Sequence, residues 1–315
     1  MSTLPVPSQS HAIQPVQTTA NPALVYLSSL PSPESRRVMA SALNRIADMV
    51  TPGATLETFP WVALRFEHVN AIRSALMDRY KPATVNRHLA ALKGVLKAAW
   101  RMGLISDADY MRAVDVKGVR GETLPAGRML EPGEVAALVA ACKADATPAG
   151  KRDAALLAVL LAAGLRRAEA VALDVEDYNP ETGELAIRHG KGRKERIVWL
   201  TNGARRAVNA WLEARGDEPG PLFLPVNKGG RIIPKRMTSQ AIYNALQKRA
   251  KQAGVTKFTP HDLRRTFAST LLDNGADLAV VSALMGHADI ATTKRYDRRG
   301  EEAKRAAAHL FHFPF

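Results

Sequence analysis

The stretch KRDAALLAVLLAAGLRRAEAVAL, residues 151–173, reads as a helix that is apolar on every side. A helix without a polar face is typical of the centre of a domain. Its second half carries the adjacent arginines Arg166 and Arg167, just after Gly164 and Leu165. Because Arg166 follows so apolar a segment, it is hard to explain as an ordinary exposed surface residue. An ion pair with Glu169 at the edge of the core is the simplest structural explanation.

The sequence on either side of this helix predicts a mainly α domain with one small antiparallel hairpin. EPGEVAALVAACKA, residues 131–144, reads as a helix, whereas GELAIRHGKGRKERIVWL, residues 183–200, holds two strand-forming runs around the turn-rich GKGRK. The turn places Lys191 between two glycines, next to Arg193 and Lys194. An ordinary exposed turn is the alternative to a functional role for Lys191.

A second group of polar residues lies in TPHDLRRTFASTLLDNG, residues 259–275. Thr259 is the expected N-cap, Pro260 is at the first helical position, and Asn274 with Gly275 ends the helix. His261 and Arg264 are three residues apart and share a face near the helix N-terminus, where backbone N–H groups and the helix dipole favour an anion such as phosphate.

The stretch MGHADIATTKRYDRR, residues 285–299, places a tyrosine inside a basic cluster. We expect the helix before it to stop at Gly286, with His287 on the following turn and Tyr296 about two turns further on. Taken one at a time, the two histidines (His261 and His287) read as structural residues and Tyr296 as a half-buried aromatic. Only the combination favours a functional site.

The first half of the chain predicts a separate helical domain. Helices are expected at residues 32–50, with Ser32 as N-cap and Pro33 at the first helical position, and in residues 60–80 and 81–105. In the last of these, Val85, Leu89, Leu92 and Leu96 form an apolar stripe. Basic residues of this helix are Arg87, Lys93, Lys97 and Arg101, and those of the hairpin turn are Arg193 and Lys194. They are the candidate residues for binding a polyanion such as DNA.

Composition indicates a polyanionic partner. The chain has 315 residues, with 44 Lys and Arg against 30 Asp and Glu, a formal charge of +14. A basic surface that only serves solubility is the alternative. Cys142 is the single cysteine, which excludes an intramolecular disulfide and fits a reducing compartment. No apolar run is long enough to span a bilayer, so we expect a cytoplasmic protein with no membrane partner.

The motifs GLRRAE, GKGRKER, HDLRRTFAS and GHADIATTKRY, in this order, resemble the tyrosine recombinases, also called phage-type integrases, and the Xer-like members especially. The resemblance covers the catalytic half, and the helical first half is similar to the core-binding domain of that family. The resemblance implies a two-domain DNA clamp, mainly α with a small antiparallel sheet, in a nucleoid-associated bacterial protein.

The resemblance also implies a role for each matched position. Tyr296 would attack the scissile phosphodiester and become joined to the DNA 3′-phosphate. Arg166 and Arg264 would hold the non-bridging oxygens, since guanidinium forks stabilise charge that develops at phosphorus. Lys191 would protonate the departing 5′-oxygen. His261 and His287 would complete the pocket, and the neighbouring arginines Arg167 and Arg265 could replace Arg166 and Arg264 in part.

This scheme explains the positive charge around the tyrosine. A phenol is a weak nucleophile at neutral pH because it keeps its proton, and nearby cations favour the phenolate while they bind the phosphate. The scheme requires no metal and no cofactor such as ATP. The sequence contains no P-loop pattern GxxxxGK[ST] and no HExxH motif.

We therefore expect a site-specific DNA recombinase, of which four protomers act together on two duplex DNA sites. A partner recombinase or an accessory protein could also take part. The expected segments are a disordered tail (1–20), a SAM-like core-binding domain (21–111), a linker (112–128), a catalytic domain (129–304) and an apolar tail (305–315). The tail is expected to dock on a neighbouring protomer, the alternative being that it folds on its own core. The competing functions are a type IB topoisomerase and a non-catalytic DNA-binding accessory protein.

Overall fold

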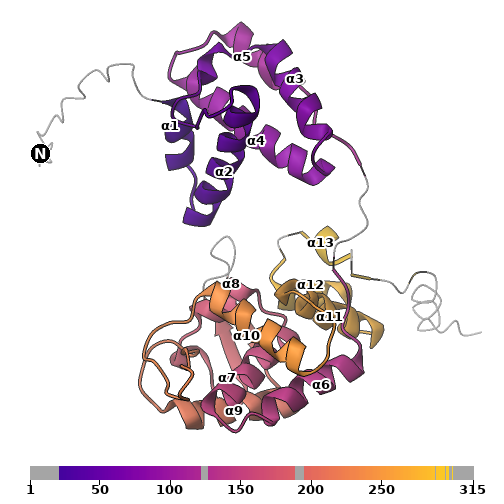
Figure 1. The fold of residues 1–315 in the computed structure, drawn as a ribbon. Coiled ribbons are helices and arrows are strands. Elements are labelled where there is room, and N and C mark those ends of the chain that lie inside the picture. The colour runs from indigo at the N-terminus through magenta and orange to yellow at the C-terminus, as the bar shows by residue number, and fades with distance from the viewer. Residues whose placement is uncertain are drawn as a thin grey trace, which may run out of the picture. The chain divides into compact units, whose positions relative to one another are not determined.

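Helical periodicity runs through both halves of the chain, and the computed structural model is mainly helical with a small antiparallel sheet (Figure 1). It describes residues 21–121, 127–188, 195–287, 289–294, 296–297 and 300. The predictions for the tail 1–20, for Lys191, Arg193 and Lys194, and for the tail 305–315 concern residues outside those ranges. The chain divides into two units, Met1–Pro125 and Ala126–Phe315.

The first unit is a helical bundle arranged around its longest helix, α4. Its elements are α1 (Pro22–Ser28), α2 (Pro33–Val50), η1 (Trp61–Ala63), α3 (Phe66–Met77), α4 (Pro82–Arg101) and α5 (Asp107–Val114). Helix α4 contacts all the others because its predicted apolar stripe from Val85 to Leu96 is buried against them. The cap at Ser32 is confirmed, since its Oγ accepts a hydrogen bond from the Ser35 amide at 3.1 Å.

The segment 112–128, predicted as an extended linker, is structured at both ends. Helix α5 continues to Val114, and Val116 is buried in the core of the first unit. The Lys93 ammonium donates to the Val116 carbonyl at 2.6 Å, which ties the chain after α5 to α4. At the other end, the Arg128 amide donates a hydrogen bond within the second unit. The first residues of the predicted linker therefore belong to α5 and to the core of the first unit.

The second unit holds the hairpin and the remaining helices. They are α6 (Pro132–Lys143), α7 (Pro148–Leu157), the π-helical turn η2 (Ala158–Ala162), α8 (Arg167–Ala172), η3 (Val175–Asp177), β1 (Glu184–Ile187), β2 (Arg196–Trp199), α9 (Asn202–Arg215), α10 (Ser239–Gln252), α11 (Pro260–Asp273), α12 (Leu278–Met285) and α13 (Ala291–Lys294). No element was predicted where α9 lies, although Val208 and Trp211, spaced for one helical face, are fully buried there.

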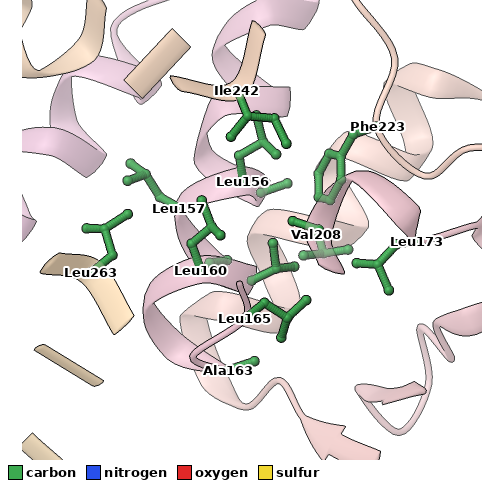
Figure 2. Packing of buried hydrophobic residues seen from close by; sticks show 14 of the residues in the cluster. Leu156, Leu157, Leu160, Ala163, Leu165, Leu173, Val208, Phe223, Ile242 and Leu263 are labelled. Carbon is green, nitrogen blue, oxygen red and sulfur yellow. The ribbon is translucent and has the colours of Figure 1, made fainter. Parts of the chain in front are cut away.

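The prediction that residues 151–173 lie at the centre of a domain is confirmed. Leu156, Leu157 and Leu160 point into a core that also receives Val208 from α9 and Ile242 from α10 (Figure 2). Cys142 is buried in the same cluster, and burial raises the pKa of its thiol to about 12. It therefore behaves as a small apolar residue, as predicted.

The same stretch is not one continuous helix. After α7 the chain passes through η2 and breaks at Gly164, whose φ of 61° is left-handed and favours glycine. A Cβ at this position would overlap the ring of Phe267. The interruption is needed because α11 packs closely against η2. It separates the central helix from α8 and leaves Arg166 in the turn between them.

The hairpin prediction is confirmed by the antiparallel pairing of β1 with β2. Leu185 pairs with Val198 and Ile187 with Arg196, so these four side chains share one face. Leu185, Ile187 and Val198 are buried on that face. The register therefore directs Arg196 toward the inside of the unit.

Candidate functional site

The break between η2 and α8 positions Arg166 as the residue that caps α8. Its backbone N–H donates to Glu169 Oε2 at 2.8 Å, and its Nη1 donates to Oε1 at 2.7 Å. The Arg166 Nη2 also reaches the carbonyl of Gly286 at 3.3 Å. The ion pair with Glu169 is therefore present, and it holds the guanidinium of Arg166 at the end of α12 rather than on the outer surface.

Glu169 is shared with a second arginine that the sequence did not single out. Arg196 donates through Nη1 and Nη2 to the two carboxylate oxygens of Glu169 at 3.2 and 2.8 Å, and through Nε to the carbonyl of Leu284 at 2.8 Å. Glu169 is only 3 % exposed. Burial alone would raise the pKa of its carboxyl, but the hydrogen bonds from Arg196 and Arg166 outweigh burial and lower it.

The N-terminal end of α11 has the predicted cap. The Thr259 N–H and hydroxyl both donate to Asp262 Oδ2, at 2.7 and 2.8 Å, with Pro260 at the first helical position. One turn on, Arg264 is 2 % exposed, and it donates to the carbonyls of Gly164 and Met285. Burial and the nearby Arg166 lower the pKa of Arg264 to about 10, so it remains a cation at neutral pH.

Helix α12 ends at Gly286 in the left-handed conformation, as predicted, and His287 follows it. The His287 amide donates to the Ser282 carbonyl at 3.1 Å, and Nδ1 lies 2.7 Å from the hydroxyl of Thr293 in α13. Burial first, and then Arg264 and Arg166, lower the pKa of His287 to about 4. The imidazole is therefore neutral at pH 7.

Tyr296 lies between the two histidines and is 6 % exposed. Its hydroxyl is 3.3 Å from His261 Nε2, and the ring centroids of Tyr296 and His287 are 6.3 Å apart with an interplanar angle of 28°. The guanidinium carbon of Arg265 lies 5.8 Å from the centre of the Tyr296 ring. Partial burial, Arg264 and Arg265 lower the pKa of His261, although much of this residue is exposed. The lowered pKa favours the neutral imidazole of His261, which has one ring nitrogen without a proton.

The structure thus brings together five of the six predicted catalytic residues, Arg166, His261, Arg264, His287 and Tyr296. The sixth, Lys191, lies outside the described residues. The neighbouring arginines take different places: Arg265 contacts the Tyr296 ring, and the Arg167 guanidinium lies over the ring of Tyr243.

Two residues of the site, Arg196 and Thr293, were assigned no role from the sequence. Arg265 was considered only as a partial replacement for Arg264, and it contacts the Tyr296 ring instead. Arg196 could have been suspected, because the hairpin register places it on the buried face.

Of the candidate DNA-binding residues, Arg87, Lys97 and Arg101 are exposed on α4, while Lys93 is half-buried and bound to Val116. Within the described ranges, no group of His, Cys, Asp and Glu side chains suits a metal ion. None of the helices in those ranges combines the length and the apolar character that crossing a membrane demands.

The chain is similar to a known protein family, to curated relatives and to solved structures. Residues 128–302 match the model described as the phage integrase family. The chain is 36 % identical to the tyrosine recombinase XerD of Pseudomonas aeruginosa over 265 residues, which cover 80 % of this chain and 84 % of the relative. It is 30 % identical to the tyrosine recombinase XerC of Alcanivorax borkumensis, with 88 % of each chain covered. A crystal structure of a lambda integrase (75–356) dimer bound to a core site is similar in fold, with a TM-score of 0.66 and 14 % identity over 88 % of this chain and 93 % of that one.

Proposed function

The chain belongs to the phage integrase family and is a tyrosine recombinase, and from that premise we propose that Tyr296 cuts and rejoins duplex DNA at a specific site through a 3′-phosphotyrosyl intermediate. The observation that carries this assignment is the position of the Tyr296 hydroxyl, 3.3 Å from His261 Nε2 and within a group that holds Arg166, Arg264 and His287. Guanidiniums can hold the phosphate oxygens and an imidazole can accept the phenol proton when a phosphoryl group is transferred to a phenol.

In the proposed reaction the Tyr296 oxygen attacks the scissile phosphorus. His261 Nε2, in the tautomer that carries its proton on Nδ1, accepts the phenol proton. The bond from phosphorus to the 5′-oxygen breaks as the new bond forms, and the 5′-oxygen leaves with a proton supplied by Lys191. The phosphotyrosyl bond retains the energy of the phosphodiester, so a 5′-hydroxyl can reverse the step.

Arg166 and Arg264 would hold the non-bridging oxygens of the phosphate. Each guanidinium has five N–H donors in a fixed fork, and the bonds to Glu169 and to backbone carbonyls use only some of them. These bonds fix the direction of the remaining donors before DNA arrives. A guanidinium that is already oriented loses little freedom when the phosphate binds.

The DNA partner follows from the same premise. Arg87, Lys97 and Arg101 would place the exposed face of α4 against backbone phosphates. Because each phosphate contact releases counterions, affinity should fall steeply with salt concentration. Strand exchange between two sites would use four protomers.

The tail 305–315 is proposed to dock on a neighbouring protomer. The second unit has an apolar groove of about 580 Å³ between α6, α7, η2 and α9, lined by Val135, Val139, Ala154, Leu161, Ala207 and Ala210. The tail ends in the apolar and aromatic sequence LFHFPF. Such side chains can pack on the alanine and valine side chains of this groove, whose lining also includes the charged residues Lys143, Asp145, Lys151 and Arg206.

Covalent capture of DNA tests the proposed chemistry. The wild type, Tyr296→Phe and the matched control Tyr178→Phe, which removes another buried hydroxyl of the same unit, are expressed in the source cell and lysed in denaturant. DNA joined to the wild type and to Tyr178→Phe at discrete loci, and absent from Tyr296→Phe, is the expected result. Attachment scattered over the genome would favour a topoisomerase. If a nicked trapping substrate that carries the bound sequence also stays unattached, the protein is a non-catalytic DNA-binding factor.

A separate experiment tests the tail. Deletion of residues 309–315, and Ala210→Glu in the groove, should each abolish cooperative assembly on paired sites while binding of single protomers is kept. Ala210→Ser is the matched control, because it adds no charge. If the deletion leaves cooperative assembly unchanged, docking in trans is wrong, and the tail then folds on its own core or has no role in assembly.

A further inference from the structure

A second pocket lies at the catalytic candidates, on the side of α8 and α10, and shares Arg166, His261 and Arg264 with them. It has a volume of about 390 Å³ and is lined by Arg166, Arg167, Tyr243, Thr259, His261 and Arg264, together with two apolar residues. Among the residues that the structure describes, none with an acidic side chain lines this pocket. In the proposed function, Arg166, His261 and Arg264 serve the scissile phosphate. Arg167 and Tyr243 have no part in that chemistry.

Arg167 differs from the other arginines of the site in its electrostatic balance. Arg166 and Arg196 share the Glu169 carboxylate, whereas among the described residues Arg167 has no acidic partner. Its guanidinium carbon lies 6.0 Å from the centre of the Tyr243 ring. The ring face attracts the cation and restricts its position without neutralising its charge. A fixed cation without a counterion in a concave pocket favours an anion.

The identity of that anion follows from the position of Arg167 in the chain. Arg166 and Arg167 are consecutive at the start of α8, and Arg166 turns toward Glu169 and Gly286 while Arg167 turns toward α10. Phosphates repeat along a DNA strand, so the anions nearest to the scissile phosphate are its neighbours on the same strand. Two adjacent guanidiniums that diverge in this way can bind two successive phosphates.

We propose that Arg167, held by the ring of Tyr243, binds the backbone phosphate next to the scissile phosphate on the cleaved strand. This assignment rests on the proposed function and adds a positioning contact to it. Arg167 would set the register of the strand, so that the scissile phosphorus lies against Tyr296. The contact carries no base preference, because phosphates are the same at every nucleotide.

Neutral backbone substitutions test this contact independently of the chemistry. Genomic fragments retained by the Tyr296→Phe protein supply the bound site, and duplexes of it are made with a single methylphosphonate at each phosphate around the scissile position. Equilibrium affinity is measured for Tyr296→Phe alone and combined with Arg167→Ala or Arg167→Gln. Arg231→Ala, which removes an exposed arginine of the same unit, is the control.

We expect one flanking methylphosphonate to weaken binding by at least about tenfold in the Tyr296→Phe parent and to have no further effect once Arg167 is replaced. The control Arg231→Ala should keep the full effect. Tyr243→Phe retains the ring and should bind as the parent does, whereas Tyr243→Leu should lose part of the effect. Thermal unfolding of each variant shows whether it remains folded.

The proposal is overturned if Arg167→Ala and Arg167→Gln, both folded, keep the full sensitivity at every flanking phosphate, or bind unmodified DNA as tightly as the parent. These outcomes are separate from those of the covalent capture. If the protein binds DNA through Arg167 but never becomes joined to it, the Arg167 contact stands and the proposed reaction is wrong. If the protein becomes joined to DNA but binds without Arg167, the proposed reaction stands and the Arg167 contact is wrong.

Discussion

The guanidinium of Arg196 donates to both carboxylate oxygens of Glu169, at 3.2 and 2.8 Å. This bidentate pair joins strand β2 to helix α8, and Arg166 binds the same carboxylate from the other side. One buried anion therefore organises two cations from distant parts of the sequence. The stability of the site and its geometry should both depend on Glu169.

Replacing Glu169 by Gln should destabilise the second unit by about 3 kcal/mol, because removing one partner of a buried ion pair leaves the other charge uncompensated. DNA cleavage should fall as well, since Arg166 loses the bond that orients it. Denaturant titration and a covalent-trapping assay measure the two effects. Glu213→Gln, an exposed change on α9, is the control.

Acid should reduce the difference between the wild type and Glu169→Gln. The folded state lowers the pKa of Glu169, so its stabilisation is complete above the ordinary carboxyl pKa of about 4.3 and is lost as the pH falls through the lower folded value. A difference in unfolding free energy that is small at pH 7 would contradict the role given to this carboxylate.

On acidification, the loss of stability due to His287 should begin at a higher pH than the loss due to Glu169. Its pKa drops from the ordinary 6.5 to about 4 in the folded protein, so between these values the unfolded state binds the proton more readily. Stability due to His287 is therefore complete above pH 6.5 and decreases toward pH 4. Unfolding free energies of His287→Asn, measured across and above this window, should vary less with pH than those of the wild type.

The exposed His68→Asn is the control for that titration. A profile of His287→Asn that runs parallel to the wild type would show that the imidazole is not buried in its neutral form.

Arg264→Lys should lower the rate of DNA cleavage by roughly 10²–10³-fold, because an ammonium cannot replace a guanidinium fork at a developing negative charge. It should also destabilise the fold by about 1–3 kcal/mol, since the carbonyls of Gly164 and Met285 lose their common donor. Cleavage of a trapping substrate and denaturant titration provide the measurements.

Arg249→Lys is the matched control for the loss of a buried arginine. Arg249 is fully buried and binds Asp153 and Asp145, at 2.7 and 2.6 Å, away from the site. It should lose stability and retain cleavage at a temperature where it is folded. Cleavage by Arg264→Lys within a few fold of the wild type would remove Arg264 from the proposed mechanism.

Gly164→Ala should destabilise the protein more than Gly275→Ala. Both glycines have positive φ, 61° and 87°, so alanine is strained at each by about 1–2 kcal/mol. Only at Gly164 would the new Cβ overlap a neighbour, the ring of Phe267, whereas Gly275 has no atom within 4 Å of that position. Overpacking should add about 1–3 kcal/mol at Gly164, and denaturant midpoints would reveal it. Equal losses in the two variants would show that α11 can move away from the break.

Short-range rules of the sequence were sufficient for much of this fold. The caps at Ser32 and Thr259 and the helix end at Gly286 depend on residues within one helical turn, and the hairpin depends on two runs separated by a short turn. The central helix was also predictable, because its composition is apolar on all sides. The resemblance of the ordered motifs then supplied the five catalytic candidates that the structure brings together.

Other features required the tertiary structure. The break at Gly164 meets α11, Arg264 donates to a carbonyl 100 residues away, and Arg196 binds a carboxylate 27 residues away. None of these pairings leaves a local pattern, because each depends on which elements pack together and on how their side chains are desolvated there. Periodicity and caps arise from neighbours along the chain, whereas the partners of a buried charge are decided only when the core closes around it.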